Sequence, residues 1–188
     1  MTNTDVLKWI KKNIGTYIQK ALLARPGSIY TEDWLAGIAC RETRDLIARN
    51  AFSPAGNTID PLTVCALMRG DYSQRAHETE KQYHGYGITQ IDIASFPDFV
   101  HSGNWKNPYS CFLKSIDVLE GKRKYIVSHC PGIEEDPMFH QHITAAYNNG
   151  EGNQVKVIQA KQDPDTRTTG HNYSKAVFEF AEIYKALV

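Results

Sequence analysis

The chain has 188 residues, with 21 Lys and Arg against 21 Asp and Glu, so its formal net charge at pH 7 is zero. It is 41% hydrophobic and 22% charged, a composition that excludes an intrinsically disordered chain and fits one globular domain over 1–188. Zero net charge argues against a protein that binds nucleic acid through a large basic face. We also expect no signal peptide and no membrane span, because neither a leader pattern nor a long apolar run is visible.

Helical periodicity predicts most of the elements. An apolar stripe indicates a helix over about 5–24, which ends at the turn residues 25–28. The next helix begins at Thr31, since Thr is a good N-cap and two acids follow it in the first turn. Later helices are predicted after Asn107-Pro108, after Asp136-Pro137 as far as 148–150, over 154–160 and over about 173–184.

The middle of the chain has a different pattern. Residues 50–61 are rich in turn formers, 61–69 form a short apolar run, and 70–84 are polar and predict a surface loop. In 85–92 two glycines precede alternating β-branched residues, which indicates a tight hairpin or short strand. The predicted fold class is therefore mainly α (α+β), with a small β-hairpin near the middle of the chain.

Neither a metal nor another cofactor is expected. The histidine His77 is followed by Glu78, but the pair does not continue into the His-Glu-x-x-His pattern of zinc enzymes. The cysteines are widely spaced, without a Cys-x-x-Cys pair, and we expect most of them to be free and buried, although disulfides cannot be assigned. They are Cys40, Cys65, Cys111 and Cys130.

Glu42 occupies an unusual position. It lies on the stripe defined by Leu35, Ile38 and Leu46, where an apolar residue is expected. A carboxyl group placed there loses hydration, which raises its pKa and suits it to act as a general acid near neutral pH. The alternative is an ion pair with Arg41 or Arg44 at a partly exposed edge.

Two more segments carry candidate chemistry. The first, Gly85-Tyr86-Gly87-Ile88-Thr89-Gln90-Ile91-Asp92, has glycines that let the backbone approach another strand or a ligand. The second, residues 145–153, joins small alanines and a tyrosine to a glycine-rich turn. Taken alone, the first segment is better explained by an ordinary hairpin, and the second has a glycine C-cap as its alternative explanation.

The order of these motifs is informative. Arg-Glu-Thr-Arg on a helix is followed by Gly-Tyr-Gly-Ile-Thr-Gln-Ile-Asp, then Ala-Tyr-Asn-Asn-Gly-Glu-Gly-Asn, then a final helix that opens with a tyrosine. This order resembles goose-type lysozymes and the catalytic domains of soluble lytic transglycosylases. The resemblance covers about Thr31 to Tyr184, within a catalytic core of 31–188. It is weakest over 50–84 and absent from the N-terminal helix (1–27).

The resemblance implies a lysozyme-like fold whose groove holds the glycan strands of peptidoglycan. Glu42 matches the catalytic acid of the family. Asp92 matches the aspartate that goose-type lysozymes carry after the Gln segment. A further aspartate usually follows a glycine shortly before that segment, and Asp71 is the best match, with Glu78 or Glu80 as alternatives. The substrate-binding positions implied are Gly87, Gln90, Tyr147, Asn148 and Tyr173.

The function implied is a monomeric, inverting muramidase that acts on the cell wall and cleaves the β-1,4 bond between N-acetylmuramic acid and N-acetylglucosamine. We expect Glu42 to protonate the leaving oxygen and Asp92, with or without Asp71, to orient water. Two other readings stay open, a lytic transglycosylase that gives 1,6-anhydro products and a glycan-binding module without activity. Chitin is an alternative substrate. Phage lysis or dedicated secretion could deliver the protein, and an exported toxin would have an immunity protein as inhibitor.

Overall fold

The computed structural model describes residues 1–51, 59–72 and 82–187. In these ranges the chain is mainly helical and carries one small antiparallel sheet. The helices are α1 (Asn3–Leu23), α2 (Glu32–Asn50), α3 (Pro61–Ala66), α4 (Pro97–His101), α5 (Pro108–His129), α6 (Phe139–Asn149), α7 (Glu151–Gln159) and α8 (Tyr173–Ala186). The strands are β1 (Arg69–Tyr72), β2 (Tyr83–Tyr86) and β3 (Ile91–Asp92).

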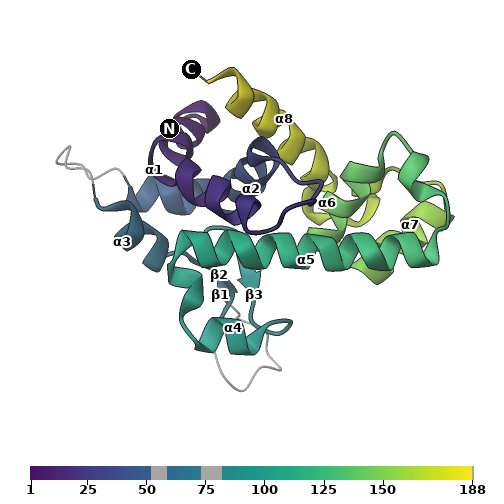
Figure 1. Cartoon of the computed structure of the whole chain (residues 1–188), viewed down its shortest axis with the longest axis horizontal. Coiled ribbons are helices and arrows are strands. Elements are labelled where there is room, and N and C mark those ends of the chain that lie inside the picture. The colour runs from purple at the N-terminus through teal and green to yellow at the C-terminus, as the bar shows by residue number, and fades with distance from the viewer. Residues whose placement is uncertain (52–58, 73–81, 188) are drawn as a thin grey trace.

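The long helix α5 runs through the middle of the molecule (Figure 1). Helices α1, α2 and α8 lie on one side of it, and the sheet with α4 lies on the other. Helix α2 packs closely against both α1 and α8, while α6 contacts α5, α7 and α8. The predicted helices are confirmed, although the one expected over 154–160 begins at Glu151.

The core forms where the apolar stripes of these helices meet. Ile10, Ile14 and Ile18 of α1 are fully buried, together with Leu35 and Ile38 of α2. Each such side chain contributes about 1.5–3 kcal/mol through the area that it removes from water. Helix α1, which lies outside the family resemblance, is therefore part of the same core as α2.

The start of α8 is held by a buried aspartate. The carboxylate of Asp165, in the 3-10 turn Pro164–Arg167, accepts hydrogen bonds from the backbone N–H groups of Ser174 (2.8 Å) and Lys175 (3.1 Å). The Ser174 hydroxyl also donates to it, at 2.9 Å. A negative charge at a helix N-terminus satisfies unpaired donors and suits the helix dipole. This arrangement fixes the position of Tyr173 immediately before.

The sheet is larger than the predicted hairpin. Strands β1 and β2 pair antiparallel, with Gly70 opposite Gly85, and β3 adds to β2, with Asp92 also opposite Gly85. The prediction of a surface loop over 70–84 is thus wrong at both ends of that segment, which enter β1 and β2. These strands are polar because β1 is mostly exposed, so they lack the apolar alternation of a buried strand. Glu78 and Glu80 lie outside the described residues.

Candidate active site

A cleft of about 480 Å³ opens between α2 and the sheet. Helix α2 presents one of its faces to the cleft, and β1 and β2 form the facing wall. Glu42 and Asp71 share this cleft, and so does the side chain of Gln90. The cleft is lined by Glu42, Asp45, Leu46, Arg49, Leu67, Arg69, Gly70, Asp71, Tyr83 and Gln90.

Glu42 is a partly buried carboxyl group with a raised pKa. Loss of hydration is the main cause and raises its pKa from 4.5 to about 7, and the negative charge of Asp71 acts in the same direction. The hydrogen bond from Tyr173 and the positive charge of Arg41 oppose the rise. Among the described residues Glu42 forms no ion pair, which contrasts with the alternative considered from the sequence. Glu42 therefore keeps its proton to a much higher pH than an exposed glutamate does.

The buried Tyr173 positions Glu42 from the protein interior. The Tyr173 hydroxyl donates a hydrogen bond to Oε1 of Glu42, and its ring lies 5.5 Å from the guanidinium carbon of Arg41. Tyr173 is only 2% exposed, so it supports the acid and does not face the cleft. Burial raises the pKa of Tyr173 well above its usual value, which keeps the phenol protonated and able to donate.

Tyr147 is partly buried and packs against the same core. Its hydroxyl donates to the backbone carbonyl of Thr89 at 2.9 Å, and burial together with nearby groups, including Glu42, raises its pKa. The Thr89 hydroxyl lies 2.6 Å from that of Ser115 in α5. Tyr147 thus connects α6 to the Gly-Ile-Thr-Gln turn and holds that turn beside Glu42.

The amide of Gln90 lies over the two paired glycines of the sheet. A Cβ atom at Gly70 or Gly85 would approach Oε1 of Gln90 to 2.2 or 2.4 Å, so only glycine leaves room for the amide at these positions. Nε2 of Gln90 donates to the carbonyl of Gly87 at 2.8 Å, and the backbone of Gln90 is left-handed (φ 52°). The amide is thereby fixed at the cleft wall.

Gly87 has a structural role in the turn. Its φ of 78° is left-handed, and a Cβ there would lie 2.7 Å from both Sγ of Cys111 and the carbonyl oxygen of Trp105. The glycines that the sequence singled out thus allow close backbone approach, to protein groups in each case. Gly87 does not line the cleft itself.

The two candidate aspartates differ in their surroundings. Asp71 lies at the exposed edge strand β1, lines the cleft with Glu42 and has a left-handed backbone (φ 51°). Asp92 accepts hydrogen bonds from the backbone N–H (2.9 Å) and the hydroxyl (2.6 Å) of Ser95, and it is not among the cleft residues. Of these two aspartates, only Asp71 lines the cleft with Glu42, and Asp45 of α2 lines it as well.

Asn148, a predicted substrate-binding residue, makes a structural hydrogen bond instead. Its Oδ1 accepts the backbone N–H of Thr169 at 2.8 Å, which joins the end of α6 to the segment before α8. Of the predicted site residues, the cleft itself is lined by Glu42, Asp71 and Gln90. The buried Tyr173 and the partly buried Tyr147 support that site through hydrogen bonds, whereas Asp92, Gly87 and Asn148 shape the backbone around it.

Several cleft residues were missed from the sequence. Asp45, Leu46 and Arg49 follow Glu42 by three, four and seven residues, which places them on the same helix face. That spacing could have identified them. Arg69 and Tyr83 could not be found in this way, because they reach the cleft only through the pairing of β1 with β2.

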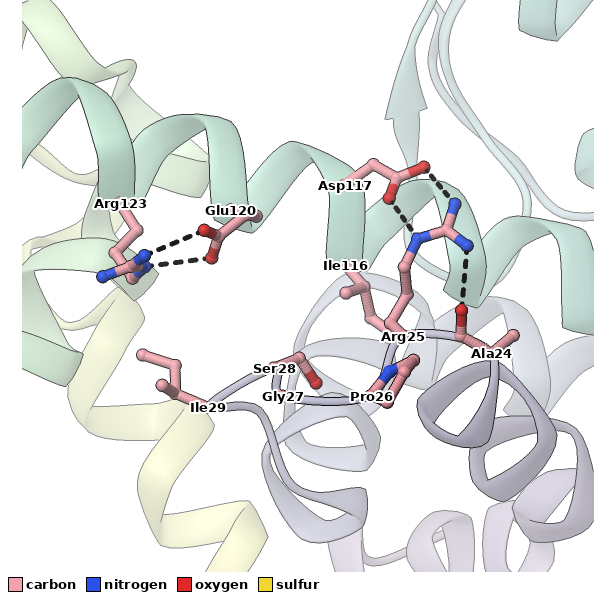
Figure 2. Close-up of a pocket in the computed structure, with 10 residues that line it drawn as sticks. All are labelled: Ala24, Arg25, Pro26, Gly27, Ser28, Ile29, Ile116, Asp117, Glu120 and Arg123. Atoms are coloured by element: carbon pink, nitrogen blue, oxygen red, sulfur yellow. Dashed lines mark hydrogen bonds and ion pairs between the residues drawn. The ribbon is translucent and has the colours of Figure 1, made fainter.

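A second hollow, of about 260 Å³, lies between the turn after α1 and helix α5 (Figure 2). Its charged side chains are paired with one another: Arg25 with Asp117 at 2.7 Å, and Arg123 with Glu120 at 2.9 Å. None of the predicted site residues lines it. The hollow is thus a place where ion pairs join the turn after α1 to α5.

No protein-family model matches the chain, and no curated protein matches it at a significant level. No helix in the described ranges is long and apolar enough to cross a bilayer. In the same ranges, no three potential metal-ligating side chains gather at one point.

Proposed function

We propose that the chain is a peptidoglycan muramidase with a lysozyme-like fold, related to goose-type lysozymes. The observation that carries this proposal is Glu42, a partly buried carboxyl group with a pKa of about 7 that lines a cleft beside Asp71. A general acid must hold its proton near the working pH, and burial gives Glu42 that property. The order of the sequence motifs supplies the substrate class.

In the proposed reaction, Glu42 donates its proton to the O4 oxygen of N-acetylglucosamine as the bond from C1 of N-acetylmuramic acid to O4 breaks. A water molecule forms the new bond to C1 from the opposite face, and Asp71 accepts its proton. Inverting glycosidases place two carboxyl groups about 6.5–9.5 Å apart to hold this water. Proton exchange with solvent then restores both groups.

Asp92 has a different role in this proposal. Because its carboxylate accepts two hydrogen bonds from Ser95, it stabilises the turn after β3. Asp71→Asn should therefore lower kcat strongly, while Asp92→Asn should act mainly through the stability of that turn. Asparagine retains the size of the side chain and, at position 71, tolerates the left-handed backbone.

The test is digestion of purified sacculi followed by mass spectrometry of the released fragments. A hydrolase gives reducing muramic acid ends, and NMR of the first products should show the inverted α-anomer. Fragments lacking one water, which carry 1,6-anhydro ends, would show a lytic transglycosylase instead.

Glu42→Gln is the matched control, because glutamine keeps an oxygen that can accept the Tyr173 hydroxyl. We expect loss of wall clearing with native circular dichroism. A glycan-binding module would bind sacculi equally well with either residue and release nothing, and that result would overturn the proposal. Chitin oligomers in parallel assays show whether the muramyl side chain is needed.

A further inference from the structure

Two arginines line the cleft, and neither has an acidic partner in the part of the chain that the structure describes. Arg49 comes from α2 and Arg69 from β1, so they approach from opposite walls. Within the described ranges, neither has a carboxylate within ion-pair distance. The only side-chain hydrogen bond of Arg49 there runs from Nε to the carbonyl of Asp45, at 3.1 Å.

Other arginines of this protein do pair with acids. Arg25 binds Asp117 at 2.7 Å, and Arg123 binds both Glu120 and Glu134 at 2.9 Å. The acids that share the cleft with Arg49 and Arg69 are not within ion-pair distance of them. Among the described residues, the donors of these two guanidinium groups have no acidic partner, and only Nε of Arg49 has an acceptor, the carbonyl of Asp45.

Arg69 is held by aromatic rings. Its guanidinium carbon lies 5.9 Å from the ring centre of Tyr83 and 5.7 Å from that of Trp105. Such cation–π contacts restrict the side chain while leaving its N–H groups free to donate. Trp105, only 4% exposed, thus acts as a buried support for Arg69. A planar guanidinium that is already positioned binds a carboxylate through two parallel hydrogen bonds at a low entropic cost.

The cleft also offers apolar contact. Leu46 lines it from α2, and Leu67 lines it although 49% of Leu67 is exposed. A ligand that suits this surface carries a carboxylate together with small alkyl groups. Neutral N-acetylglucosamine polymers have no carboxylate.

We infer that Arg49 and Arg69 recognise a carboxylate on the muramyl side of the substrate and so set the preference for peptidoglycan over chitin. This inference rests on the proposed function. The carboxylate has two possible sources, the stem peptide or the lactyl group that is exposed once the peptide is removed.

Three substrates separate these sources: glycan strands with stem peptides, strands stripped by an amidase so that the lactyl carboxylate is free, and chitin oligomers. We expect Arg69→Gln and Arg49→Gln each to lower kcat/KM about tenfold, because a hydrogen bond to a charged group is lost. The loss should occur on strands with stem peptides if the peptide supplies the carboxylate, and on stripped strands if the lactyl group supplies it. The effect should lie mainly in KM, as for contacts made equally in the ground and transition states. Rates on chitin oligomers should not change.

Arg69→Lys and Arg167→Gln complete the set. Lysine keeps the charge without the planar fork and should recover only part of the activity. Arg167 is exposed and outside the cleft, so its replacement removes the same charge elsewhere and should have no effect. An equal loss on all three substrates, or no loss on any, would overturn the inference.

Binding to the Glu42→Gln protein separates this inference from the proposed function. If the wild-type chain cleaves none of the substrates but the two arginines still govern the affinity for carboxylate-bearing strands, then the muramidase proposal fails and the recognition stands. If cleavage occurs and the affinity does not depend on either arginine, the recognition fails alone.

Discussion

At the residue scale, Glu42 combines two opposing requirements. It occupies a position on the apolar stripe of α2, yet it must reach a solvent-filled cleft. The buried Tyr173 hydroxyl donates to its Oε1, and Glu42 lines the cleft. The raised pKa follows from this half-buried position and requires no dedicated acidic neighbour beyond Asp71.

The raised pKa of Glu42 should make the stability of the folded protein depend on pH. Glu42 ionises near 4.5 in the unfolded chain and near 7 in the folded one, so the folded state binds more protons between these values. Stability should therefore fall as pH rises from about 4.5 to 7, by an amount on the order of 3 kcal/mol. Glu42→Gln should remove this fall and melt higher than wild type at pH 8.

Thermal melts across that pH range measure the effect. The matched control is Glu179→Gln, at an exposed position of α8, which should leave the fall unchanged. In activity assays the wild-type rate should decline above about pH 7 as Glu42 loses its proton. A rate that rises through pH 8 would contradict the role of Glu42 as acid.

Tyr173→Phe should shift this alkaline decline upward. The hydroxyl stabilises the ionised form of Glu42, so its loss raises the pKa of Glu42 further. We also expect kcat to fall a few-fold to about tenfold, because a positioning hydrogen bond is lost. Tyr125→Phe, at an exposed site on α5, serves as the control, and an unchanged pH profile in Tyr173→Phe would contradict the assignment.

At the element scale, the small sheet positions the side chain of Gln90. Gly70 and Gly85 face each other across β1 and β2, and the amide of Gln90 occupies the space that their missing Cβ atoms leave. Gly85→Ala should displace this amide, lower activity and destabilise the protein by about 1–3 kcal/mol. Urea unfolding and wall-clearing assays measure both effects.

A double substitution makes this prediction specific. In the Gln90→Ala background the clash is absent, so Gly85→Ala should cost much less there than in wild type. Gly121→Ala on α5 is the control, since a Cβ there meets nothing within 4 Å and should stabilise the helix by about 0.5–1 kcal/mol. Equal costs of Gly85→Ala in both backgrounds would refute the arrangement.

The elements also show how far the sequence could predict the site. The apolar stripe of α2 located Glu42, because helix periodicity is a local property. The sequence around β1 and β2 lacks the apolar alternation from which strand pairing can be predicted. Arg69 and Tyr83 were therefore not predicted to lie at the cleft. The roles of Asp71 and Asp92 could not be separated either, since their difference lies in tertiary surroundings and in a local bond to Ser95.

At the scale of the whole molecule, α1 is inseparable from the core although no motif lies on it. Ile14 is fully buried in the main core cluster. Ile14→Ala should cost about 2–5 kcal/mol, because it leaves a cavity between packed helices. Circular dichroism and tryptophan fluorescence should show one coincident urea transition, whereas two separate transitions would contradict a shared core.

The four cysteines have a consequence for the conditions that the fold tolerates. All are buried free thiols, and burial raises the pKa values of Cys40 and Cys65 to about 12. The reactive thiolate is therefore scarce, and none of the four contributes a crosslink that a reductant could break. The same folded state should persist in reducing and in oxidising surroundings, so a change of redox environment would neither activate nor inactivate the cleft.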